Sequence, residues 1–274
     1  MRSGFARLHP LVDLTFFVLV LAFAMFLSHP AVQLAGLVCA ALFALRCTGR
    51  GFGRRMAMLL PLMLLAAVVN PLVSHQGVTV LFRFPSGNAC TLESVLYGIS
   101  AAVRLGTAVL WFMGWNAVMT SDKFVYLFGR ILPSLSLTLS MGLRFVPRLL
   151  RRTREVAQAQ KLARPAERGW LAGIRDTADS MKSRGYGLPK RTAFSLFRFT
   201  LRDGICLGVL AALGGIVLAG SLTGGLKWWY YPAPGGATGG QAALWTAAFV
   251  LLAAFPLIFD AKEAIQWRAS RSRT

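Results

Sequence analysis

Six apolar runs constrain this chain more than any other feature of its sequence. They span residues 11–28, 31–45, 56–73, 95–119, 205–222 and 242–259. A bilayer core about 30 Å thick requires about 20 apolar residues in helical form, so each run approaches or reaches the length that crosses a membrane. The short second run is separated from the first by His29-Pro30, which favours a turn. The sequence therefore predicts an all-α, polytopic membrane protein with about six transmembrane helices.

The composition excludes two other classes of chain. Of 274 residues, 55% are hydrophobic and 15% are charged, and the mean hydropathy is +0.57. Neither an intrinsically disordered chain nor an ordinary soluble domain has this balance. The first run leads directly into the second and lacks a small-residue cleavage site, so we interpret it as a membrane helix and not as a cleaved signal peptide.

The distribution of positive charge predicts the orientation in the membrane. The chain has 30 Lys and Arg against 10 Asp and Glu, a formal net charge of +20. With six crossings, 27 of the 30 basic residues fall on one side; the opposite loops hold Arg83 and Lys227, and Arg104 lies within the fourth run. Because basic loops are retained in the cytoplasm, we expect a multi-pass protein of the cell inner (plasma) membrane with both termini cytoplasmic.

The basic residues also suggest a division of the chain. We expect N-terminal transmembrane helices in residues 1–135, cytoplasmic amphipathic coupling helices in 136–203, and C-terminal transmembrane helices with a basic tail in 204–274. Apolar residues recur at spacings of three, four and three from Leu171 to Met181, which predicts a surface helix that ends near Gly185. The run 131–146 is rich in Ser and Thr and is expected to be interfacial.

A row of arginines precedes that helix. Arg144, Arg148 and Arg151 follow one another at helical spacing, so they share a face. Such a row can face lipid headgroups or a protein partner, and the pattern leaves both interpretations open.

Few residues suggest chemistry. There is no phosphate-binding loop followed by Lys-Ser/Thr, and the cysteines and histidines are scattered, so we expect no catalytic residue, no metal site and no cofactor.

Three ionisable residues, Asp13, Arg104 and Asp260, lie in or at the ends of the apolar runs, where such residues are functional candidates. Asp13 and Asp260 are near enough to the boundary to be solvated. The tract 228–231, Trp-Trp-Tyr-Tyr, is typical of an aromatic belt at the headgroup level.

One cytoplasmic segment resembles a known family. Residues 177–187 read Thr-Ala-Asp-Ser-Met-Lys-Ser-Arg-Gly-Tyr-Gly, and residues 190–195 read Lys-Arg-Thr-Ala-Phe-Ser. Together with Asn-Pro-Leu at 70–72, Ser-His-Gln-Gly at 74–77, and the segments 128–133 and 140–147, this order resembles the transmembrane T component of energy-coupling factor transporters. The resemblance covers most of residues 8–203.

The resemblance implies a function and partners. In that family the T component is a membrane scaffold that joins a substrate-binding membrane subunit to two ATP-binding-cassette ATPases, in importers of vitamins or of cobalt and nickel ions. Two coupling helices each end in a small residue followed by Arg-Gly and contact one ATPase each. Ser183, Arg184 and Gly185 match the second of these motifs.

The first motif departs from the family pattern and has two alternative positions. Arg164 follows the usual approach, but Pro165 stands where Gly is expected, whereas Arg168 and Gly169 match a few residues later. Only twenty residues separate Arg164 from Arg184, a shorter stretch than is usual in the family.

Two functions of other classes compete with the transporter subunit. A polytopic membrane enzyme acting on phosphorylated lipid headgroups would need clustered carboxylates, and the nearest pair, Asp176 and Asp179, has no third ligand. Nucleic-acid binding by residues 144–203 would need aromatic residues interleaved with the basic ones, and few are present. We therefore expect a non-catalytic subunit in the lipid bilayer that binds no nucleic acid.

Overall fold

The computed structural model describes residues 4–83, 89–129 and 197–271, together with Arg151, Glu155, Ser180 and Ser183. The chain divides into two compact units. The first, which we call the bundle unit, combines Met1–Met119 with Phe199–Thr274, and the second comprises Thr120–Arg198.

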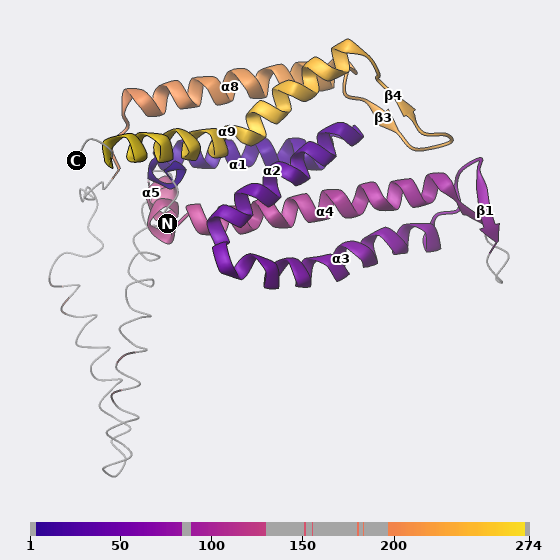
Figure 1. Cartoon of the computed structure of the whole chain (residues 1–274), viewed down its shortest axis with the longest axis horizontal. Coiled ribbons are helices and arrows are strands. Elements are labelled where there is room, and N and C mark those ends of the chain that lie inside the picture. Colours follow the sequence, from indigo (N-terminus) through magenta and orange to yellow (C-terminus); the bar gives the residue numbers. More distant parts are fainter. Residues whose placement is uncertain are drawn as a thin grey trace, which may run out of the picture. The chain divides into compact units, whose positions relative to one another are not determined.

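Six long helices build the bundle unit, and helices that follow one another in the chain run in opposite directions (Figure 1). An even number of alternating helices returns the chain to its starting end, and the N- and C-terminal ends of the unit lie at that end (Figure 1). Short 3-10 turns, η1 (Phe5–Arg7) and η2 (Gly49–Gly51), precede α1 and α3. The helices are α1 (Pro10–Phe26), α2 (Pro30–Thr48), α3 (Phe52–Val73), α4 (Leu92–Val118), α8 (Leu201–Leu222) and α9 (Gly240–Arg271).

Five of these helices are long and apolar enough to cross a membrane: α2, α3, α4, α8 and residues Gly240–Glu263 of α9. The sixth, α1, is apolar but has 17 residues. The prediction of a helical, multi-pass membrane protein is confirmed at this level. The relative lengths of the first two helices were predicted wrongly, because α2 extends over 19 residues and α1 is the shorter one.

All six helices begin earlier than their apolar runs predict, and at α4 and α8 a side-chain cap accompanies the earlier start. Thr91 caps α4, its Oγ1 accepting a hydrogen bond from the backbone N–H of Ser94 at 3.3 Å. Thr200 and Asp203 form a reciprocal capping box at the start of α8. Such caps satisfy N–H groups that have no partner within the helix, so they allow α4 and α8 to start in polar sequence before the apolar run.

Two short antiparallel hairpins lie at the end of the bundle unit opposite the termini (Figure 1). Strand β1 (Val80–Arg83) pairs with β2 (Ala89–Thr91), and β3 (Trp228–Trp229) pairs with β4 (Gly235–Gly236). The all-α prediction contained neither hairpin.

The core of the bundle unit is an aromatic cluster. Phe5 from η1 is completely buried, and its ring centroid lies 5.3 Å from that of Phe16 and 6.2 Å from that of Phe43, both in edge-on geometry. Trp111 of α4 closes the cluster, 5.5 Å from Phe16. Edge-to-face contacts between aromatic rings stabilise a fold by more than the burial of their apolar area alone. They therefore fix α1, α2 and α4 against one another.

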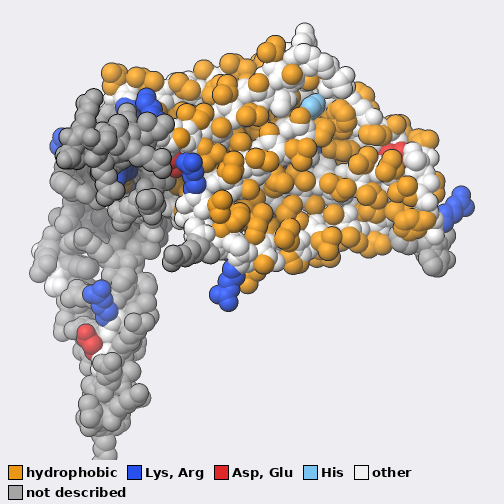
Figure 2. Space-filling model, viewed as in Figure 1, with side chains coloured by type: hydrophobic (Ala, Val, Ile, Leu, Met, Phe, Trp, Pro, Cys, Tyr) orange, Lys and Arg blue, Asp and Glu red, His pale blue; other side chains and the backbone are white. Residues whose placement is uncertain are grey.

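Helix α3 is packed differently. Leu59 is its one buried residue, and apolar side chains are exposed along its length. In the space-filling view, hydrophobic side chains cover the visible side of the bundle unit, and Lys and Arg lie toward its two ends (Figure 2). An exposed apolar band between charged ends is the surface of a membrane protein.

The second unit contributes one described helix, α5 (Ser121–Gly129). The Tyr126 hydroxyl of this helix donates a hydrogen bond to the carbonyl oxygen of Phe197 at 3.4 Å, and the two rings pack 5.2 Å apart. The predicted interfacial run 131–146 lies outside the described residues, and so does most of the predicted surface helix 171–184.

Candidate functional site

The predicted ATPase-contact segment is described at one of its residues. Ser183 is helical and exposed, and its hydroxyl donates a hydrogen bond to the carbonyl oxygen of Ser180 at 2.9 Å. An exposed helical serine agrees with the prediction of a helix that reaches this point. The other predicted contact residues, Arg164, Arg168, Gly169, Arg184 and Gly185, lie outside the described residues.

The end of the bundle unit that holds both termini is rich in charge. Arg46 lies in the last turn of α2, and Arg54 and Arg55 lie in the first turn of α3. Arg7 forms an ion pair with Glu263 of α9 at 3.1 Å. Arg202 lies 4.6 Å above the ring of Phe259. We call this the basic end. Helix α4 ends here and α8 begins here, so the chain leaves the bundle unit before residue 120 and returns to it after residue 198 at this end (Figure 1).

Carboxylates at the basic end bind backbone N–H groups. Asp203 accepts a hydrogen bond from the N–H of His9 at 3.1 Å, and Asp260 accepts one from the N–H of Phe5 at 3.0 Å. Asp260 is partly exposed, as expected near a boundary, but the expectation that Asp13 is solvated is wrong. Asp13, in the first turn of α1, is completely buried. Asp203 and Asp260 hold the N-terminal segment in place through these hydrogen bonds.

A polar cluster lies deeper in the bundle unit, around Arg104 of α4. The Nη2 atom of Arg104 donates hydrogen bonds to the hydroxyls of Ser28 and Ser100, each at 3.4 Å. The Ser100 hydroxyl donates to Oε1 of Gln33 at 2.9 Å, and Nε2 of Gln33 donates to the carbonyl oxygen of Ser28 at 3.2 Å. Arg104 thus belongs to a closed network that joins α2, α4 and the α1–α2 turn; we call it the Arg104 cluster.

The short α1 places this turn at the depth of Arg104. At 1.5 Å per residue, α1 is about 25 Å long and α4 about 40 Å. The segment that contains β3 and β4 packs over the turn: Nε2 of His29 lies 3.1 Å from the carbonyl oxygen of Ala237, and the Tyr230 hydroxyl donates to the carbonyl oxygen of Ser28 at 3.4 Å.

The tract 228–231 therefore differs from a simple aromatic belt. Trp228 packs edge-on against His29 at 5.5 Å, and Tyr230 is buried against Tyr97 of α4 at 5.6 Å. Trp229 is exposed, as the belt interpretation expects. Most of the tract therefore packs against α4 and the α1–α2 turn.

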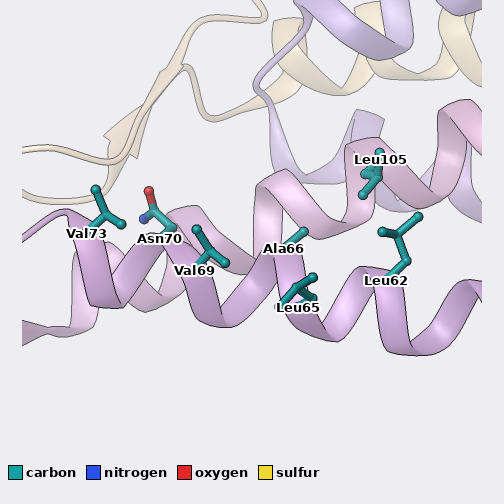
Figure 3. Close-up of a pocket in the computed structure, with 7 residues that line it drawn as sticks. All are labelled: Leu62, Leu65, Ala66, Val69, Asn70, Val73 and Leu105. Carbon is teal, nitrogen blue, oxygen red and sulfur yellow. The ribbon is translucent and has the colours of Figure 1, made fainter.

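A groove of about 370 Å³ runs along α3 beside α4 (Figure 3). Its only polar lining residue is Asn70, whose Nδ2 donates to the carbonyl oxygen of Ser94 at 2.8 Å. That hydrogen bond holds the C-terminal end of α3 to α4, so Asn70 has a structural role in a groove that is otherwise apolar. The lining residues are Leu62, Leu65, Ala66, Val69, Asn70 and Val73 of α3, and Leu105 of α4.

Comparison with known proteins identifies no family for this chain. A scan against protein-family models found no matching family, and a search of curated proteins found no match. Within the part of the chain that the structure describes, no three His, Cys, Asp or Glu side chains gather as a metal site would require. The apolar helices define the coarser class, a multi-pass helical membrane protein.

Sequence reasoning found Arg104 but missed its partners. Arg104 was a candidate because a charge within an apolar run is unusual. Ser100 precedes it by four residues, the spacing that places two side chains on one helix face, so this partner had a sequence signal. Gln33 and Ser28 had none, because the turn that brings them to Arg104 is a feature of the tertiary structure.

Proposed function

We propose that this chain is the transmembrane T component of an energy-coupling factor importer. Its role is to join two ATP-binding-cassette ATPases in the cytoplasm to a substrate-binding membrane subunit that takes up a vitamin or a transition-metal ion. The observation that carries the proposal is the segment 177–195 with Ser183, Arg184 and Gly185 in family order. The proposed orientation has six crossings, an inner-membrane location and both termini in the cytoplasm.

The bundle unit supports this proposal through its charge. Basic residues gather at the end where residues 120–198 leave and rejoin it, and Arg83 and Lys227 lie beyond the opposite helix ends. The positive-inside rule then makes the basic end cytoplasmic, on the side where ATPases are found. A long insert that starts and ends on this side suits a coupling segment.

The chemistry of the proposed contact follows from the residue types. An arginine can form two parallel hydrogen bonds with one carboxylate of a partner, and a glycine beside it allows the two backbones to approach closely. The chain has no ATP-binding loop, so the ATPases supply the energy. Rigid helices then transmit their closure to the membrane subunit, which is where the substrate is recognised.

The test compares Arg184→Glu with Arg148→Glu, a control in the arginine row that can face lipid headgroups. Reversing a charge that is paired at a protein interface costs about 2–5 kcal/mol, whereas one charge at a lipid surface is worth about 1 kcal/mol. We expect Arg184→Glu to accumulate normally in the membrane but to lose both co-purifying ATPases and substrate uptake. Arg148→Glu should retain most of both.

Equal and mild effects at the two positions would contradict the proposed ATPase contact. Loss of the protein itself from the membrane in Arg184→Glu would do so as well, because an exposed contact residue is not needed for folding.

A further inference from the structure

Arg104 lies near the middle of a membrane-spanning helix. Twelve residues separate it from the start of α4 and fourteen from its end. These separations correspond to about 18 Å and 21 Å along the helix axis, further than an arginine side chain can extend. Its guanidinium therefore cannot leave the bilayer core for the lipid headgroups at either end of α4.

The charge of Arg104 has no counter-charge among the described residues of the bundle unit. The Nη2 atom of Arg104 donates hydrogen bonds to two serine hydroxyls, both at 3.4 Å, and its Nε atom is buried without a hydrogen-bond partner among the described residues. A guanidinium carries five N–H donors, so most of its capacity remains available. The carboxylates of the unit lie elsewhere. Asp13, Asp203, Asp260 and Glu263 lie near the basic end, and Glu93 lies beside Thr79 at the opposite end of α4.

The Arg104 cluster also holds the guanidinium in a defined position. Ser100 is fixed by Gln33, and Gln33 is fixed by the carbonyl oxygen of Ser28. Arg104 as a whole residue is partly exposed, and its Nε atom is buried. A cation that is held in one orientation in a region of low dielectric constant strongly favours a nearby anion.

We propose that Arg104 binds a carboxylate on a membrane helix of the substrate-binding partner subunit. The inference rests on the proposed function, which supplies such a partner. A carboxylate matches the fork of the guanidinium and neutralises it within the bilayer. Lipid phosphate is too distant from this depth, and the groove beside α3 is lined by Leu105 and not by Arg104, so it offers no pocket for a small carboxylate at this cation.

The test uses the complex purified from native membranes through a tag on this chain. The amounts of ATPase and membrane subunit are measured per mole of chain by quantitative mass spectrometry. We expect Arg104→Gln to lower the membrane subunit at least tenfold with the ATPases unchanged, and Arg104→Lys to cause a smaller loss. The matched control is Thr107→Val at similar depth, because the Thr107 hydroxyl bonds only to its own helix, at the carbonyl oxygen of Val103, and its loss should change neither amount.

A charge swap identifies the partner group. In the Arg104→Glu chain, each intramembrane Asp or Glu of the co-purified membrane subunit is replaced in turn by Arg, and one replacement should restore at least half of the binding. Retention of the membrane subunit within twofold by Arg104→Gln, or failure of every swap, would overturn the inference.

A photo-crosslinking residue at Ala101, one turn before Arg104 and partly exposed, provides a measurement with Arg104 intact. It should crosslink to the membrane subunit, and absence of that crosslink would also overturn the inference.

The same preparation separates the two proposals. ATPases that are absent from the wild-type complex would overturn the proposed function and this inference with it. ATPases that are present, with a membrane subunit that is insensitive to Arg104, would overturn the inference alone.

Discussion

Replacement of Gly98 by alanine tests how α3 is held to the rest of the bundle unit. A Cβ atom at Gly98 would collide with the carbonyl oxygen of Ala67 and would lie 3.3 Å from Cδ of Pro71. The carbonyl belongs to the backbone of α3, so it cannot rotate away as a side chain can. The substitution therefore forces α3 away from α4 at the level of the groove.

The size of the effect follows from two opposing terms. Overpacking of this kind costs about 1–3 kcal/mol, and alanine regains up to about 1 kcal/mol over glycine in a helix. A net loss of about 1–2 kcal/mol corresponds to a Tm lower by about 2–8 °C in a chain of this size. Leu59 is the one buried residue of α3, so little other packing is available to absorb the shift.

The assay is thermal unfolding in detergent, followed with a thiol-reactive fluorescent dye. The cysteines are free, and Cys39, Cys90 and Cys206 are buried, so unfolding makes them reactive. The matched controls are Gly208→Ala and Gly215→Ala in α8, where a Cβ atom would meet nothing within 4 Å. These variants should melt at or above the temperature of the wild type. A Gly98→Ala variant that melts with them would refute the close approach of α3 to α4.

Three further predictions concern topology, energetics and helix capping. Cysteines introduced at Gly236 and Ser270 should be labelled from opposite sides of the membrane, and labelling of both from one side would exclude the proposed topology. The purified chain should hydrolyse no ATP until ATPase subunits are added; turnover by a preparation shown to be free of them would contradict the scaffold role. Thr200→Ala removes the capping box of α8 and should cost about 1 kcal/mol, seen as a lower Tm in the dye assay, and an unchanged Tm would show that the cap is dispensable.

The six helices of the bundle unit could be predicted because the bilayer leaves little choice. A span must satisfy its own backbone and present an apolar surface, so hydropathy alone located every long helix of this unit. Helix starts were missed where a polar cap precedes the apolar run, as at Thr91 and Thr200. The lengths of α1 and α2 were assigned wrongly because a count of apolar residues does not show where the backbone leaves the helix.

The two hairpins and the burial of Asp13 could not be predicted from local sequence. Strands of two to four residues have no measurable periodicity, and pairing depends on where the helices place their ends. Asp13 was expected to be solvated because it lies near the predicted membrane boundary, but its burial depends on tertiary packing, which the local sequence does not show.

The candidate sites also contain residues that the sequence reveals and residues that only the tertiary structure brings together. Arg104 is conspicuous within an apolar run, whereas Ser28 is 76 residues away in sequence and reaches it only through the depth of the α1–α2 turn. The ATPase-contact prediction rests on the order of residue types, and Ser183 alone among its residues is described.

Helix α4 connects the two proposed contacts. Its end at Val118 leads into residues 120–198, and Arg104 lies about 21 Å back along the same helix. Trp111, completely buried in the aromatic cluster, lies between the two points and fixes α4 against α1 and α2. A force applied by ATPases at the basic end would therefore move α4 together with its closest neighbours and not bend it alone, because packed cores resist continuous deformation. On our two proposals, the carboxylate at Arg104 would then move with the core of the bundle unit, which is the mechanical property that a coupling scaffold requires.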